Sequence, residues 1–155
     1  MVRIRAAKLA STAVWLCALG AATPALAQSS IGTWVRQPDP KMPGEVTMTI
    51  EECCNGGRRL TYRFSTMKQV MVVESPFNGQ EVPVLLDGKP SGQTMAITRL
   101  DPRHTSTILK MNGKPYGTSK AELSADGRMI TVENEVTMAA GGNVAGKKTE
   151  IWMRK

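Results

Sequence analysis

The sequence has few of the residues that usually carry chemistry. Of its 155 residues, one is histidine, three are cysteine and 5% are aromatic. It has no Gly-x-Ser-x-Gly elbow, His-Glu-x-x-His motif, Walker loop or dinucleotide-binding fingerprint. These absences argue against the common hydrolases, metalloproteases and nucleotide-dependent enzymes while leaving enzymatic activity open. We expect neither a cofactor nor a resident metal ion.

A strong charge of one sign is also lacking once the N-terminal segment is set aside. The formal net charge is +7, but residues 1–27 hold three of the 20 Lys and Arg residues and none of the 13 Asp and Glu residues. The other 17 basic and 13 acidic residues leave a balance of +4. The pairs Arg58-Arg59 and Lys147-Lys148 are too short to form a nucleic-acid-binding surface. We therefore expect no nucleic-acid partner.

The N-terminal segment is typical of a signal peptide. Three basic residues within the first eight positions precede an apolar run over residues 9–22, and small residues up to Ala27 match a leader-peptidase site. The apolar run is too short to span a bilayer. We expect cleavage after Ala27, a periplasmic or secreted domain of residues 28–155, and no stable membrane insertion. A lipoprotein anchored at Cys17 is the alternative, but the residue before that cysteine is not small.

Turn signals are abundant in the chain. Asn and Asp tolerate positive φ better than most residues and Gly tolerates it freely, so each Asn-Gly or Asp-Gly pair can close a tight turn between two strands. Five such pairs occur, at Asn55-Gly56, Asn78-Gly79, Asp87-Gly88, Asn112-Gly113 and Asp126-Gly127. Most are flanked by alternating apolar and polar residues, and no long segment has helical periodicity. The pattern predicts a meandering antiparallel β-protein.

The alternation assigns side chains to two faces. Val46, Met48 and Ile50 share one face of a strand, and Tyr62 continues the buried set after the next turn. Residues 70–73 and 82–86 are less regular, and because Pro83 lies inside the second segment we expect an edge or a bulge there.

The number of such segments predicts a single antiparallel up-and-down barrel of about eight strands. A closed barrel removes unpaired strand edges and can hold one small molecule in its interior. On alternation alone, the side chains expected to face that interior are Ile50, Tyr62, Val132 and Met138. Packing of a filled core explains these four residues equally well.

Several segments resemble a group of small bacterial secreted proteins with a lipocalin-like domain, most of them of unknown function. The resemblance rests on Gly32-Thr33-Trp34 and on residues 46–51, 85–89, 97–103, 111–114 and 123–132. It covers most of the chain after the signal peptide, but these motifs are turn and strand signals. The resemblance therefore implies a barrel and a cup for a small ligand. The chain departs from the pattern at Cys53-Cys54 and at residues 90–93.

The same resemblance implies a role for Trp34 and Arg154. Lipocalins place an arginine late in the barrel against the tryptophan of the opening strand, where a cation–π contact closes one end. Trp34 and Arg154 stand at similar places in this chain. The alternative is an Arg154 side chain that is simply exposed near the C-terminus.

Cys53 and Cys54 are the two cysteines that follow the signal peptide. Adjacent Cα atoms are about 3.8 Å apart, below the usual disulfide range, so we do not expect a bond between them. Three alternatives stay open. Cys54 is a buried thiol beside an exposed Cys53, or Cys53 links two chains into a dimer, or both thiols and some methionines bind Cu(I).

Three functions from different classes fit these observations. The first is a lumen that binds a small, largely apolar molecule. The second is an assembly protein with a filled barrel that makes contacts through a strand edge or Cys53. The third is a small isomerase or cyclase, which requires His104 or a buried carboxylate to face the lumen.

Overall fold

The computed structural model describes residues 29–141 and 143–155, so the expected signal peptide lies outside the described residues. Ten strands follow one another along the chain. They are β1 (Gly32–Arg36), β2 (Val46–Cys53), β3 (Gly57–Phe64), β4 (Val70–Ser75), β5 (Asn78–Leu86), β6 (Lys89–Arg99), β7 (His104–Met111), β8 (Lys114–Leu123), β9 (Met129–Val136) and β10 (Gly146–Arg154). No helix in the described residues is long and apolar enough to cross a membrane.

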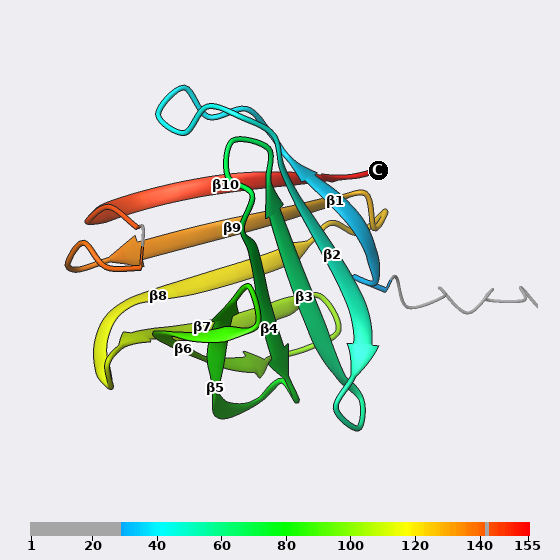
Figure 1. Cartoon of the computed structure of the whole chain (residues 1–155). Helices are drawn as coiled ribbons and strands as arrows, with labels where there is room; N and C mark the ends of the chain where they lie inside the picture. The colour runs from blue at the N-terminus through cyan, green and yellow to red at the C-terminus, as the bar shows by residue number, and fades with distance from the viewer. Residues whose placement is uncertain (1–28, 142) are drawn as a thin grey trace, which may run out of the picture.

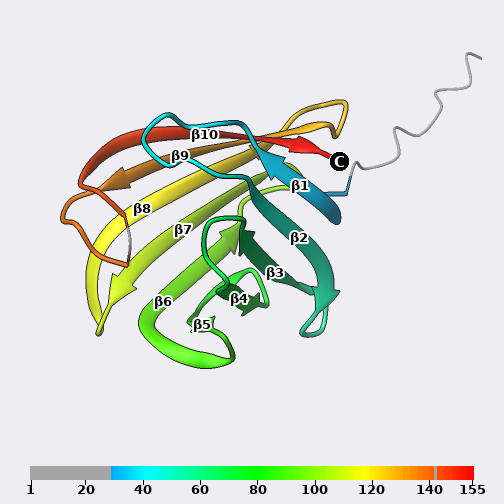
Figure 2. The ribbon, with the colours of Figure 1, turned by 45° about the horizontal axis from the view of Figure 1, so that its top comes forward.

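The strands form one closed antiparallel barrel (Figures 1 and 2). Each strand pairs with its neighbours in sequence, and β1 also pairs with β10, which closes the ring. The prediction of an up-and-down antiparallel barrel is confirmed. The prediction of about eight strands is wrong, because both irregular segments, 70–73 and 82–86, lie within separate strands, β4 and β5.

Pro83 is accommodated where strand pairing is weakest. The β4–β5 ladder ends at the pair Val73↔Val84, so Pro83 has no partner on β4. On its other side, the β5–β6 ladder shifts register between Pro83 and Leu85. The missing N–H therefore disrupts little, and the expected bulge is confirmed.

The Asn-Gly and Asp-Gly pairs do not all form turns. Asp87-Gly88 and Asn112-Gly113 have positive φ at both residues and lie between the pairs Leu86↔Lys89 and Met111↔Lys114, as two-residue turns require. Asn78-Gly79 instead begins β5. Phe77, with φ of 57°, takes the positive-φ position in the preceding turn. The prediction of a turn at Asn78-Gly79 is therefore wrong.

The up-and-down order places the connections at two ends of the barrel. The terminal end carries the β2–β3, β4–β5, β6–β7 and β8–β9 turns together with both ends of the described chain. The loop end carries the longer β1–β2 and β9–β10 connections and the remaining turns. Buried apolar side chains form three clusters inside the ring, the largest around Trp34, Met48 and Trp152.

Candidate functional site

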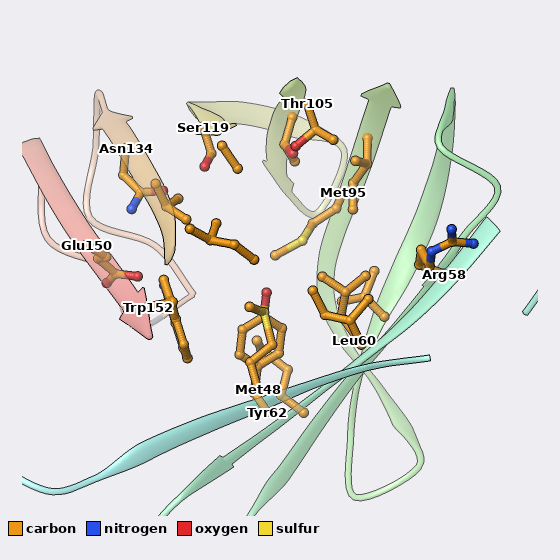
Figure 3. A pocket seen from close by; sticks show the side chains of 18 of the residues that line it. Met48, Arg58, Leu60, Tyr62, Met95, Thr105, Ser119, Asn134, Glu150 and Trp152 are labelled. Atoms are coloured by element: carbon orange, nitrogen blue, oxygen red, sulfur yellow. The ribbon is translucent and has the colours of Figure 1, made fainter. Parts of the chain in front are cut away.

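The barrel encloses a cavity of about 930 Å³ (Figure 3). This volume lies near the upper end of the range for small-molecule sites, about 300 to 1,000 Å³. Because successive side chains of a strand point to opposite faces, alternate residues of the barrel strands reach the lumen. Its apolar lining includes Val46, Met48, Ile50, Leu60, Phe64, Met71, Val73, Met95, Ile97, Leu109, Ile130, Val132 and Trp152.

Three of the four residues expected in the lumen lie there, namely Ile50, Tyr62 and Val132. Met138 does not line the cavity. The β8–β9 ladder ends at Gly117↔Val136, and Met138 lies beyond the end of β9 with 54% of its surface exposed. The expectation for Met138 is therefore wrong, because the alternating pattern continued for two residues past the strand.

One wall of the lumen carries polar groups among apolar side chains, and the facing wall is mainly apolar. Thr105, Ser119 and Asn134 reach the cavity from the adjacent strands β7, β8 and β9. Met48 and Tyr62 face them across the lumen in Figure 3. A bound molecule thus meets hydroxyl and amide groups on one side and thioether, aliphatic and aromatic surface on the other.

Tyr62 carries a hydroxyl group that extends into the lumen (Figure 3). Its ring meets Trp152 edge to face, with centroids 5.9 Å apart. Burial, and to a smaller extent the negative charge of Glu150, raise the pKa of the Tyr62 phenol. Within the described residues this hydroxyl makes no hydrogen bond to another group. It remains protonated at neutral pH and is free to bond a ligand.

The loop end of the lumen contains a compensated charge cluster. Glu150 lines the cavity and forms ion pairs with Arg36 at 3.5 Å and with Lys148 at 3.1 Å. Lys148 also bonds Asp39 at 2.8 Å. The hydrogen bond from Lys148 holds the pKa of Asp39 below its usual value. Burial alone would lower the pKa of Lys148, but its bonds to Asp39 and Glu150 raise it overall. With two cations and two carboxylates, this cluster has no net charge.

A second cluster at the loop end was not expected from the sequence. Gln93 and Tyr116 are buried and hydrogen-bonded to each other, and Asn143 donates to the Tyr116 hydroxyl at 3.3 Å. Burial raises the pKa of the Tyr116 phenol, although these two hydrogen bonds oppose the shift. The cluster ties the β9–β10 connection to the β6 and β8 strands.

The terminal end is closed on one side by Trp34 and Arg154. The Arg154 guanidinium lies 4.3 Å from the ring centroid of Trp34, which is fully buried. It also donates to the carbonyl groups of Gly127, Ile31 and Ser29 at 2.6 to 2.8 Å. These contacts join β1, β10 and the β8–β9 turn, so Arg154 is not simply an exposed terminal residue.

On the other side of the terminal end, arginines line the cavity. Arg58 extends from β3 and Arg99 from β6, and both border the lumen. The guanidinium of Arg99 lies 5.2 Å from the ring centroid of Phe77. Alternation could have identified Arg58, because it shares a face of β3 with Leu60 and Tyr62.

His104 lies outside the cavity lining. Its Nδ1 atom is 2.8 Å from Asp101 Oδ2, and its Nε2 atom is 3.6 Å from Glu122. The N–H of Arg103, followed by the His104 side chain, lowers the pKa of Asp101. The isomerase or cyclase hypothesis required His104 or a buried carboxylate in the lumen. Two carboxylates of the described residues line the cavity: Glu150 is part-buried and paired with two cations, and Asp101 is exposed at the terminal end, where it contacts His104.

Cys53 and Cys54 form a disulfide with each other, so the expectation against such a bond is wrong. Cys53 is the last residue of β2, and Cys54 has left the strand with a φ of 53°. Extending the β2 alternation would place the two side chains on opposite faces. The turn conformation at Cys54 instead brings both sulfur atoms together at the terminal end.

No protein-family model matches this chain, and no curated protein matches it significantly. Within the described residues, no group of three or more His, Cys, Asp or Glu side chains is placed to hold a metal ion. The cavity is therefore the feature of the described residues that bears most directly on function.

Proposed function

We propose that the protein is an exported, lipocalin-like barrel that binds a small, largely apolar molecule in its lumen. The observation that supports this best is the cavity of about 930 Å³, lined mainly by aliphatic, methionine and aromatic side chains. Burying apolar ligand surface against such a lining stabilises a complex by about 25 cal/mol for each Å² removed from water. A barrel filled with its own side chains would not offer this surface.

The arrangement of polar groups supports a binding role as well. The hydroxyl and amide groups of Thr105, Ser119 and Asn134 lie on one wall, and the Tyr62 hydroxyl faces them (Figure 3). A few placed polar groups in an apolar site orient a ligand without supplying chemistry. Export is proposed from the pattern of residues 1–27 and agrees with a binding protein that acts outside the cytoplasm.

Binding of a neutral fluorescent probe tests this function. N-phenylnaphthylamine is apolar and uncharged, and its emission rises in a dry environment. We expect saturable binding of one molecule per barrel to the exported protein after bound lipid has been removed. Ala121 lines the lumen, so Ala121→Trp should fill part of it and abolish binding. Ala125 lies in the exposed β8–β9 turn, so Ala125→Trp should bind the probe normally.

The two variants separate lumen binding from surface binding. If the original protein gives no saturable signal, the proposed function is wrong. If Ala121→Trp binds as well as Ala125→Trp, the probe lies outside the lumen and the proposal is equally wrong. Circular dichroism should show that both variants retain the β-sheet spectrum.

A further inference from the structure

Arg58 has an incomplete set of hydrogen-bonding partners at the lumen. Its Nη1 atom donates to the carbonyl groups of Gly57 at 2.8 Å and Gly56 at 3.3 Å. Its Nε atom is buried without any hydrogen-bond partner in the described residues. A buried polar atom without a partner is destabilising, and such atoms are rare in native proteins. The side chain stands beside Leu60 at the border of the cavity (Figure 3).

The surroundings of Arg58 do not supply a counter-charge. Glu52 lies opposite Arg58 in the β2–β3 register, but the described residues contain no ion pair between them. Arg99 borders the same end of the cavity and has no carboxylate partner there either, its described contact being the Phe77 ring.

Two other charged side chains, Arg103 and Asp101, line this end of the cavity. Arg103 bonds Glu122 at 2.8 Å. Asp101 accepts hydrogen bonds from the N–H groups of Arg103 and His104 and from the His104 ring. Because Arg103 is paired with Glu122, Arg58 and Arg99 face only the one lining carboxylate of Asp101, and the terminal end of the cavity carries an excess of positive charge. The charge cluster around Glu150 at the loop end is balanced.

We propose that the ligand is an amphiphilic anion, with an apolar chain in the lumen and a carboxylate beside Arg58 and Arg99. This inference rests on the proposed function and names its ligand class. A guanidinium matches a carboxylate with two parallel N–H groups, and such charge-assisted bonds are about twice as strong as neutral ones. Met48 and Met95 also line the lumen, and their flexible side chains can adapt to the apolar chain of the ligand. Thr105 offers a hydroxyl group from the facing wall.

Competition between ligands with the same chain and different head groups tests this proposal. Dodecanoate and dodecyltrimethylammonium below their micelle concentrations, and dodecanol below its solubility limit, are used to displace N-phenylnaphthylamine from the exported protein. We expect dodecanoate to compete about tenfold better than dodecanol, because its carboxylate gains a charge-assisted pair with a guanidinium; tenfold corresponds to about 1.4 kcal/mol. The cationic ligand should be the weakest competitor.

Variants assign the effect to Arg58. Arg58→Gln should remove the advantage of dodecanoate over dodecanol, a ratio of two competitors that is measured against the same probe on the same variant. Arg58→Lys should keep part of the advantage, because the charge remains but the paired N–H geometry is lost. Arg63 lies on the same strand and is exposed on its outer face, so Arg63→Gln is the matched control and should retain the full advantage.

The outcomes distinguish this proposal from the one on which it depends. If the neutral probe does not bind the original protein, the lumen function itself is wrong. If the probe binds but dodecanoate competes no better than dodecanol, only the anion proposal is overturned. An advantage that survives in Arg58→Gln, or that disappears equally in Arg63→Gln, would overturn the assignment to Arg58.

Discussion

Arg154 illustrates how much one exposed side chain can organise. Its guanidinium donates hydrogen bonds to three backbone carbonyl groups and lies against the ring of Trp34. These contacts use N–H groups that point in different directions and the planar face of the same group. A lysine keeps the charge but cannot reproduce this geometry. The contact belongs to closure of the terminal end and is separate from the proposed ligand contacts of Arg58.

Arg154→Lys is expected to lower the free energy of unfolding by about 1 to 3 kcal/mol, the loss of two or more hydrogen bonds. Urea unfolding followed by tryptophan fluorescence measures the change. Arg128, an exposed residue of the β8–β9 turn, is the control, and Arg128→Lys should change stability little. If the two substitutions change the free energy of unfolding equally, the guanidinium of Arg154 does not stabilise the terminal end of the barrel.

The two tyrosines of the chain predict an alkaline limit of stability. Burial raises the pKa of both Tyr62 and Tyr116, whereas in the unfolded chain a tyrosine ionises near pH 10. Above about pH 10 the unfolded state therefore binds fewer protons than the folded state, and stability falls as pH rises. Below that pH both states are protonated and the effect is absent.

Near-ultraviolet absorbance of phenolate measures this limit directly. In the folded protein we expect the phenolate signal to remain absent through about pH 10 and then to rise together with unfolding. Tyr62→Phe should weaken the dependence of stability on alkaline pH. A normal tyrosine titration in protein that remains folded would contradict the burial of both phenols.

Among the elements, the β2–β3 hairpin depends on close packing against the next turn. A Cβ atom at Gly57 would lie 2.2 Å from the Ser75 carbonyl oxygen and 2.7 Å from the Pro76 Cα atom. Both are backbone atoms, so neither can move aside cheaply. Gly56, one residue earlier, has a φ of 91° but open space around its Cβ position.

We expect alanine substitutions at these neighbouring glycines to lower the free energy of unfolding by different amounts. Gly56→Ala should lower the free energy of unfolding by about 1 kcal/mol, because alanine is strained at positive φ. Gly57→Ala should cost more, about 1 to 3 kcal/mol or above, because the backbone of two strands must separate. Urea unfolding of both variants tests the order. A smaller effect at Gly57 would mean that the β4–β5 turn yields easily.

For the whole molecule, ring closure leaves few unpaired strand edges in the described residues. The assembly hypothesis relied on an exposed strand edge or a free Cys53 thiol. Every described strand is paired on both sides for at least part of its length, and Cys53 is bonded to Cys54. The function and the oligomeric state, a monomer or a Cys53-linked dimer, stay predictions.

Many of the strands and their inward-facing side chains could be predicted from the sequence. Alternating residues in β2, β3 and β9 marked an inward face, and that face includes Ile50, Tyr62 and Val132. Periodicity could not locate where a strand ends, so Met138 was misplaced. It also could not show that Asn78-Gly79 lies within β5, because turn position depends on the pairing of both flanking strands.

The sequence by itself determined an antiparallel β-fold with tight turns, because side-chain alternation and turn conformations are local properties of the chain. Only the tertiary structure decided that ten strands close into a ring around a cavity of about 930 Å³. It also decided that Glu150 has partners in the lumen and that Arg58 borders it without a counter-charge. These features arise when distant strands meet, so no local pattern encodes them.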